Sequence, residues 1–158
     1  MNRGIALLFT LLIISVAVSL SIGVFNIIVG ELEIGEGARE STEAFYAADS
    51  GVECILYWDL KEHAFVFNQE KAITCANISF ANKFARTSVA DYRGGGPATV
   101  YTGPACPAGD ALILGNGSCA TLKVIKFTSG ASRLESLGEN TSNPAVTRVV
   151  QRGIEVNY

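Results

Sequence analysis

The sequence lacks most of the residue combinations that enzymes use for catalysis. His63 is the only histidine among 158 residues, so any serine–histidine or cysteine–histidine mechanism would have to use it. The glycine run Gly94-Gly95-Gly96-Pro97 is followed by no Gly-Lys pair of a phosphate-binding loop. We interpret His63 as a solvated residue near a helix end and the glycine run as a turn. We therefore expect no enzymatic activity, no catalytic residue and no cofactor.

Basic runs and metal-binding cysteine pairs are also missing. The net charge is −3 and no stretch of lysine or arginine is typical of nucleic-acid binding. The four cysteines include no C-x-x-C pair, so their spacing does not indicate zinc. The acidic residues that cluster early in the chain predict a solvated face; they are Glu31, Glu33, Glu36, Glu40 and Glu43. A DNA or surface ligand is compatible with this composition, but nothing in it supports one.

The longest stretch without charge runs from Ile5 to Val29 and has no polar face. As a helix, its 25 residues would extend roughly 37 Å, which exceeds the ~30 Å hydrocarbon core of a bilayer. Arg3 precedes it, which predicts a cytoplasmic N-terminus and export of the residues after Val29. The run is longer than the apolar region of a cleaved signal peptide, and Val29-Gly30-Glu31 is a poor cleavage site. We therefore favour a retained single-pass membrane helix over residues 5–29.

Residues 30–62 predict an amphipathic continuation of that helix. There is no proline between Glu31 and Leu60. Glycine has a low helix propensity, so the glycines at 30, 35 and 37 are expected to loosen this part of the helix. Small and apolar residues recur at helical spacing, and the charged residues fall mostly on other faces. The expected buried face consists of Ala44, Phe45, Ala48, Gly51, Val52, Ile55 and Trp58, and the charged set is Arg39, Glu40, Glu43, Asp49, Glu53 and Asp59.

Residues 63–158 predict a globular domain rich in β-structure. Apolar and β-branched runs separated by glycine, proline, asparagine and serine predict strands at 73–80, 99–102, 111–114, 120–127 and 132–137. Alternation from Val150 to Tyr158 predicts a last, half-buried strand, and Gly115-Asn116-Gly117-Ser118 predicts a tight turn. A helix followed by consecutive strands indicates an α+β fold, with a small antiparallel sheet packed on the amphipathic half of the helix.

An even number of cysteines in an exported domain permits disulfides. Cys106 and Cys119 enclose a short loop and form the favoured pair, and Cys54 on the helix is the candidate partner of Cys75. The sequence leaves all three pairings of the four residues open, and four free buried thiols are the alternative.

Three segments carry a resemblance to a known family. Arg3-Gly4 directly precedes the apolar run, residues 39–53 contain the stretch Tyr46-Ala47-Ala48-Asp49-Ser50-Gly51, and the chain ends in the strand-like residues 149–158. Together these segments resemble type IV pilin-like proteins, closest to minor pilins of the PilX-like kind. The resemblance covers the first third of the chain and its last ten residues, and it implies the pilin layout of one long helix packed on a sheet.

The resemblance also implies processing and partners. Residues 1–4 would be a prepilin leader, cut after Gly4 by prepilin peptidase, and Ile5 would become the N-methylated first residue. The expected partners are other pilin subunits, the assembly platform and its ATPase. The protein would reside in the bacterial cytoplasmic membrane before assembly and in an extracellular pilus at the cell surface afterwards. Small residues of the apolar helix, among them Ala17 and Gly23, would let neighbouring helices approach closely during filament assembly.

Phe9 departs from the family pattern. Most pilins carry a glutamate at this position, five residues after the cleavage glycine, and the acid is thought to pair with the N-terminal amine of a neighbouring subunit. A carboxylate in hydrocarbon is tolerable only with such a partner. Phe9 therefore indicates either a minor or initiating subunit, which has no preceding neighbour, or a branch of the family without the glutamate.

Two other functions share this anatomy. A pseudopilin of a type II secretion system would have the same helix and sheet. A signal-anchored exported binding domain would have them too, but would not be processed at Gly4. The sequence does not distinguish a tip from a shaft position, a pilus from a secretion system, or the ligand of the exposed loops.

Overall fold

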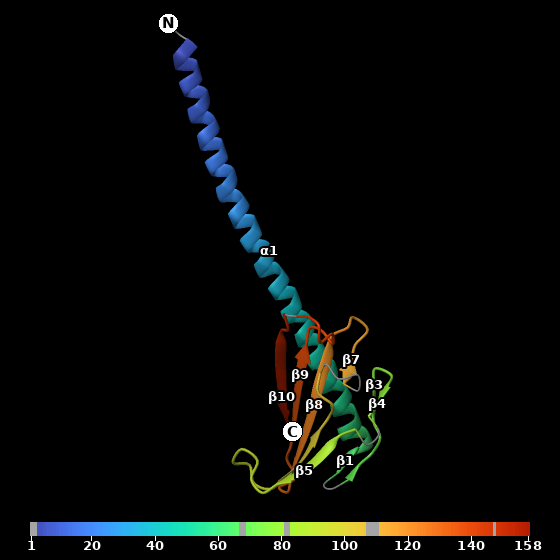
Figure 1. The fold of residues 1–158 in the computed structure, drawn as a ribbon. Helices are drawn as coiled ribbons and strands as arrows, with labels where there is room; N and C mark the ends of the chain where they lie inside the picture. The colour runs from blue at the N-terminus through green and yellow to red at the C-terminus, as the bar shows by residue number, and fades with distance from the viewer. Residues whose placement is uncertain (1–2, 67–68, 81–82, 107–110, 147) are drawn as a thin grey trace. The chain divides into compact units, whose positions relative to one another are not determined.

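A computed structural model describes residues 3–66, 69–80, 83–106, 111–146 and 148–158. The chain forms two compact units, Met1–Arg39 and Glu40–Tyr158. Met1 and Asn2, the first half of the expected leader, lie outside the described residues, as do Phe67 and Asn68. One helix, α1, runs from Arg3 to Glu62 (Figure 1). The glycines at 30, 35 and 37 do not interrupt it, so the expected loosening is not seen.

The end of α1 is set by a backbone turn. His63 follows the last helical residue with a φ of 50°, a left-handed conformation that ends a helix. The Ala64 amide then donates a hydrogen bond back to the Trp58 carbonyl at 3.0 Å. The Lys71 ammonium donates to the Glu62 carbonyl at 2.7 Å and satisfies an otherwise unpaired acceptor of the last turn. His63 itself is exposed, as the sequence indicates.

Ten strands follow the helix. They are β1 (Phe65–Val66), β2 (Gln69–Glu70), β3 (Thr74–Cys75), β4 (Ile78–Ser79), β5 (Ala85–Val89), β6 (Ala98–Thr102), β7 (Leu112–Ile113), β8 (Cys119–Phe127), β9 (Ser132–Glu139) and β10 (Gln151–Asn157). The main sheet has the order β10-β9-β8-β6-β5, with β7 also pairing β8, and every pairing is antiparallel. The α+β fold is therefore confirmed.

Most of the predicted strands are present, with two differences. The run at 73–80 is not one strand: β3 and β4 form a small hairpin, because Ala76 and Asn77 turn the chain with positive φ values. The sequence analysis also missed the two-residue strands β1 and β2, and β5, whose residues are mostly exposed and carry no apolar alternation. The predicted turn at 115–118 joins β7 to β8.

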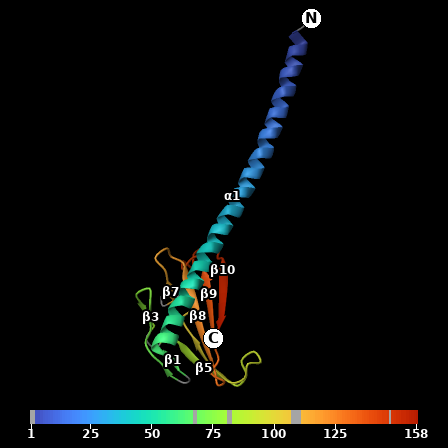
Figure 2. The same cartoon turned by 180° about the vertical axis from the view of Figure 1, so that it is seen from behind.

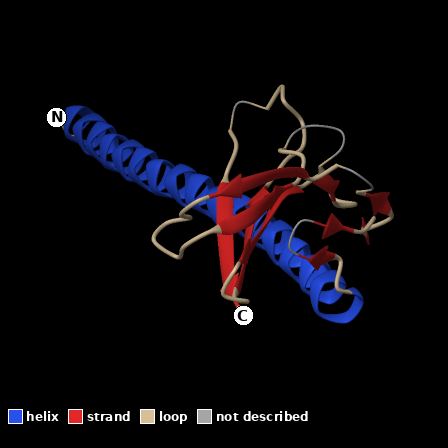
Figure 3. Cartoon of the chain, turned by 90° about the horizontal axis from the view of Figure 1, so that it is seen from below, coloured by secondary structure: helices blue, strands red, loops and turns tan. Residues whose placement is uncertain are grey.

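In the second unit, the residues of α1 from Glu40 onwards cover one face of the main sheet (Figures 2 and 3). The inner face of β8 contributes Ala120, Leu122 and Val124 to the core, and β9 contributes Leu134. Ile55 of the helix and Tyr101 of β6 are fully buried in the same core. A smaller cluster on the opposite face contains Ala98, Val100 and Ile125. We call that opposite face of the sheet the outer face.

Helix and sheet approach closely because small residues meet at the contact. A Cβ atom added to Gly138 of β9 would lie 2.0 Å from the Ala44 carbonyl oxygen and 2.5 Å from the Ala48 amide nitrogen. A Cβ atom added to Gly51 would lie 2.5 Å from the Leu122 side chain. Ala44, Ala47 and Ala48 are fully buried. Ala44, Ala48 and Gly51 therefore supply the surface on which β8 and β9 lie.

The predicted buried face of α1 is correct in its centre and wrong at two positions. Phe45 is 48% exposed, because the contact with the sheet is centred on the row of Ala44, Ala48, Gly51 and Ile55. Asp59, expected on a solvated face, is only 4% exposed. One long helix, apolar in its first half and packed in its second half against an antiparallel sheet, is a pilin-like architecture.

Candidate functional site: the apolar helix and the outer face of the sheet

The first unit presents a continuous apolar surface. Every described side chain from Ile5 to Val29 is exposed, and α1 is long and apolar enough to cross a membrane. A signal sequence near an N-terminus meets the same criterion of length and composition. An exposed apolar surface of this extent is unstable in water and requires lipid or protein around it.

The few hydroxyl groups of this segment do not form a polar face. Thr10 and Ser15 donate to the carbonyls of Leu7 and Leu12 at 2.9 and 2.8 Å. Ser19 and Ser21 donate to the carbonyls four residues earlier, both at 2.8 Å. Each of these four hydroxyls is satisfied within its own helix and needs no polar partner.

The residues predicted for processing and assembly all lie on α1. Gly4 is helical, and Ile5 and Phe9 are exposed by 57% and 62%. Ala17 is exposed as well, and an added Cβ atom at Gly23 would meet no atom within 4 Å. Ile5, Phe9, Ala17 and Gly23 are accessible to a neighbouring helix, and the roles of all five positions stay predictions.

The structure contains both favoured disulfides. Cys54 on α1 joins Cys75 on β3, with Cα atoms 5.9 Å apart, and Cys106 joins Cys119 on β8, with Cα atoms 6.1 Å apart. Glu139 lies beside the second pair, which brings three metal-type ligand atoms together. The two sulfur atoms are bonded to each other, so they cannot act as thiolate ligands. The disulfides indicate an extracytoplasmic location for the second unit.

A buried charge cluster fastens the end of the chain to α1. The Asp59 carboxylate accepts hydrogen bonds from the Lys126 ammonium and from the Tyr158 hydroxyl. Lys126 also donates to the Ser132 hydroxyl at 2.8 Å and lies 5.4 Å from the centre of the Tyr158 ring. Burial, together with the hydrogen bond to Asp59, raises the pKa of Tyr158 above its usual value. The cluster joins α1, β8 and the last residue, and we interpret it as structural.

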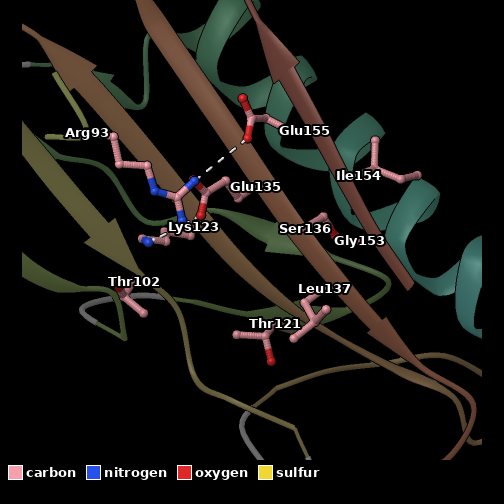
Figure 4. A pocket seen from close by; sticks show the side chains of 10 residues that line it. All are labelled: Arg93, Thr102, Thr121, Lys123, Glu135, Ser136, Leu137, Gly153, Ile154 and Glu155. Atoms are coloured by element: carbon pink, nitrogen blue, oxygen red, sulfur yellow. Dashed lines mark hydrogen bonds and ion pairs between the residues drawn. The ribbon is translucent and has the colours of Figure 1, made fainter. Parts of the chain in front are cut away.

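The outer face of the sheet carries a second polar network, and Figure 4 draws its charged members Arg93, Lys123, Glu135 and Glu155. The Lys123 ammonium donates to the Tyr92 hydroxyl at 2.8 Å and to Glu135 at 3.2 Å. Arg93, from the loop between β5 and β6, pairs with Glu135 at 3.1 Å and reaches Glu155 on β10 at 3.9 Å. Burial lowers the pKa of Lys123, but its hydrogen bonds to Tyr92 and Glu135 outweigh that effect and raise it overall.

Beside this network lies a shallow hollow of about 470 Å³. Its floor includes Thr121, Leu137 and Gly153, which are successive neighbours across β8, β9 and β10. The positive charges of Arg93 and Lys123 are balanced by Glu135 and Glu155, so the hollow has no excess charge with which to attract an ion.

Sequence reasoning did not find either network. The Asp59 cluster joins residues 67 and 99 positions apart, and the outer-face network joins residues from a loop and three strands. The available signal was the alternation of polar with apolar residues, Arg133 and Glu135 around Leu134 and Glu155 and Asn157 around Val156, which predicts one polar face of a sheet without identifying the partners. Comparison with known proteins adds no relative: no family, no curated protein and no solved structure matches this chain.

Proposed function

We propose that this protein is a structural subunit, of the minor-pilin type, in a type IV pilus-like filament. The observation that carries the proposal is the exposed, uncharged helix of residues 5–29 in a chain with a pilin-like fold. A membrane anchor alone requires only a helix of this kind joined to any domain. Here the same uninterrupted helix continues to Glu62 and forms one layer of the exported domain.

This continuity supports an assembly role. In the membrane, lipid surrounds residues 5–29; in a filament, the corresponding helices of neighbouring subunits take its place. Association of apolar helices depends on close packing, to which small residues contribute. Ala17 and Gly23 provide such positions, and the internally bonded hydroxyls of Ser19 and Ser21 expose no unsatisfied donor to a neighbour.

In this proposal, prepilin peptidase cuts after Gly4 and leaves Ile5 as the methylated first residue. The assembly platform and its ATPase then extract the subunit from the cytoplasmic membrane into the filament. Phe9 carries no charge that could pair with the N-terminal amine of a neighbouring subunit, which suits a minor or initiating position. The exported sheet and loops face outward and contribute to initiation of assembly or to surface interactions.

The intact mass and N-terminal residue of the protein in a sheared surface fraction test the proposal. We expect a chain that begins at methylated Ile5. Gly4→Arg should block the cut and leave the full chain in the membrane, whereas Gly23→Ala, which adds a methyl group where no atom lies within 4 Å, should be processed normally.

Recovery of the unprocessed chain from membranes alone would contradict the proposal and favour a signal-anchored binding domain. Normal surface export of the Gly4→Arg variant would contradict the processing step. A processed chain that is missing from the sheared fraction but required for secretion of other proteins would identify a pseudopilin instead.

A further inference from the structure

A second hollow lies within the second unit, between one flank of α1, the β3–β4 hairpin and β7 (Figures 1 and 2). Its volume is about 530 Å³, and the helix contributes Glu53, Tyr57 and Trp58 to its wall. We call it the Trp58 hollow. None of the residues that line it belongs to the Asp59 cluster or to the outer-face network, so neither network explains it.

Two contacts hold the walls of the Trp58 hollow together. The Cys54–Cys75 disulfide joins the helix to β3, with Cα atoms 5.9 Å apart. The Trp58 indole N–H donates a hydrogen bond to the Thr74 carbonyl of the same strand at 3.0 Å. Because both contacts link α1 to β3, the hollow exists before any ligand arrives, and a preformed site binds with a smaller entropic cost.

Two aromatic rings of different orientation stand side by side in this wall. The ring centres of Tyr57 and Trp58 are 5.9 Å apart, and the ring planes are inclined at 89° to each other. Tyr57 is 56% exposed, and Trp58 is half-buried. The faces of aromatic rings carry partial negative charge and attract cations, and groups of such rings bind quaternary ammonium ligands.

Glu53 is the only charged residue among the described residues that line the hollow. It is exposed, it lies one helical turn before Tyr57, and no described residue forms a hydrogen bond or ion pair with its carboxylate. The hollow therefore combines one uncompensated negative charge with two aromatic rings. Both features favour a positively charged ligand and disfavour an anion.

The lining suits an organic cation better than a metal ion. Ca²⁺ takes about six to eight oxygen ligands and Mg²⁺ about six, whereas a single carboxylate lines this hollow. Leu112 and Leu114 add apolar surface opposite the helix. Alkyl groups attached to a positively charged nitrogen atom would cover such a surface and remove it from water.

We propose that the Trp58 hollow binds the alkylated ammonium group of a small organic cation. Glu53 is the counter-ion, and the rings of Tyr57 and Trp58 contact the alkyl groups, over which the positive charge is spread. Such a group occurs in a free cation such as choline and in a phosphocholine headgroup. This inference goes beyond the proposed function and depends neither on cleavage at Gly4 nor on assembly.

Fluorescence of the full-length chain in a maltoside detergent tests the site, because Trp58 is the only tryptophan of the sequence. The probes are choline and dimethylbutanol, a neutral alcohol of the same shape in which a carbon atom replaces the charged nitrogen. We expect choline to change the emission saturably, with a dissociation constant on the order of 1 mM, and dimethylbutanol to bind about tenfold more weakly. Glycerophosphocholine distinguishes the two sources: binding tighter than that of choline assigns the headgroup, and weaker binding assigns the free cation.

Two variants separate the charge from the ring. Glu53→Gln and Tyr57→Leu should each weaken choline binding by about three- to fivefold and leave the affinity for dimethylbutanol unchanged. The matched controls are Glu62→Gln, which removes an exposed charge of α1 outside the hollow, and Tyr57→Phe, which keeps the ring. Both controls should bind choline as the wild type does. Unchanged thermal unfolding temperatures would show that all four variants are folded.

Equal affinities for choline and dimethylbutanol would overturn the proposal, because shape rather than charge would then determine binding. A loss of affinity in Glu62→Gln as large as that in Glu53→Gln would show a general effect of net charge and overturn it as well. So would the lack of a saturable response to choline at about tenfold the expected dissociation constant. None of these results affects processing at Gly4 or recovery in the sheared fraction, so failure of this site and failure of the proposed function are separable.

Discussion

Gly138→Ala tests whether close contact between helix and sheet holds the second unit together. The added methyl group would lie 2.0 Å from the Ala44 carbonyl oxygen and 2.5 Å from the Ala48 amide nitrogen. Ordinary contacts to a Cβ atom are 3.4 Å or longer, so α1 would have to move away from β9 by more than 1 Å. Both clashing atoms belong to the helix backbone, which no side-chain rotation can relieve.

The expected cost is about 3 kcal/mol or more, the upper end of the range for overpacking a close-packed core. At roughly 4 °C per kcal/mol for a domain of this size, thermal unfolding of the full-length chain in detergent should shift down by about 12 °C. Circular dichroism at a wavelength dominated by the sheet would follow the transition.

Gly153→Ala is the matched control. It introduces the same methyl group on the neighbouring strand, where the nearest atom would be 3.8 Å away, and Gly153 does not have a positive φ. We expect a change within about 0.5 kcal/mol. If Gly138→Ala were as stable as this control, helix and sheet would not be in the close contact described, and the explanation for the small residues of Tyr46–Gly51 would be wrong.

Three further predictions concern the clusters and disulfides. Asp59→Ala should lower the free energy of unfolding by about 3 to 5 kcal/mol, because it leaves the Lys126 ammonium without its carboxylate partner. Chemical denaturation measures this loss, and a loss below about 1 kcal/mol would show that the pair is not buried in solution. Because folding raises the pKa of Tyr158, its contribution to stability is complete below the unfolded pKa of about 10 and falls as the pH rises above that value. Between about pH 10 and 11, the free energy of unfolding of the wild type should therefore fall more steeply than that of the Tyr158→Phe variant. Parallel curves for the two proteins would contradict the assignment. With both disulfides formed, the denatured and unreduced protein should react with no thiol reagent, and mass spectrometry would detect alkylation if any cysteine were free.

Local sequence signals were sufficient for the elements with strong periodicity. The uncharged run at 5–29, the helix over 30–62 and the strands β6, β8, β9 and β10 each follow from a pattern within a few residues. Both disulfide partners could be proposed as well, because each pair lies at most 21 residues apart and one of them encloses a short loop.

Errors arose where two elements meet. The exposure of Phe45 depends on which row of α1 faces the sheet, and this is decided by the position of Gly138 some 90 residues later in the chain. Burial of Asp59 is possible only because Lys126 and Tyr158 arrive beside it from distant strands. From the local sequence alone, a charged residue is correctly expected on the surface, because its burial requires partners that only the folded structure brings beside it.

The sequence by itself therefore determined the apolar helix, its amphipathic continuation and the α+β class, because hydrophobic periodicity is a local property. Only the tertiary structure decided the strand order and the polar networks on both sides of the sheet. Those features depend on which residues meet after the chain has folded, and such meetings are governed by close packing and charge pairing across long separations in the sequence.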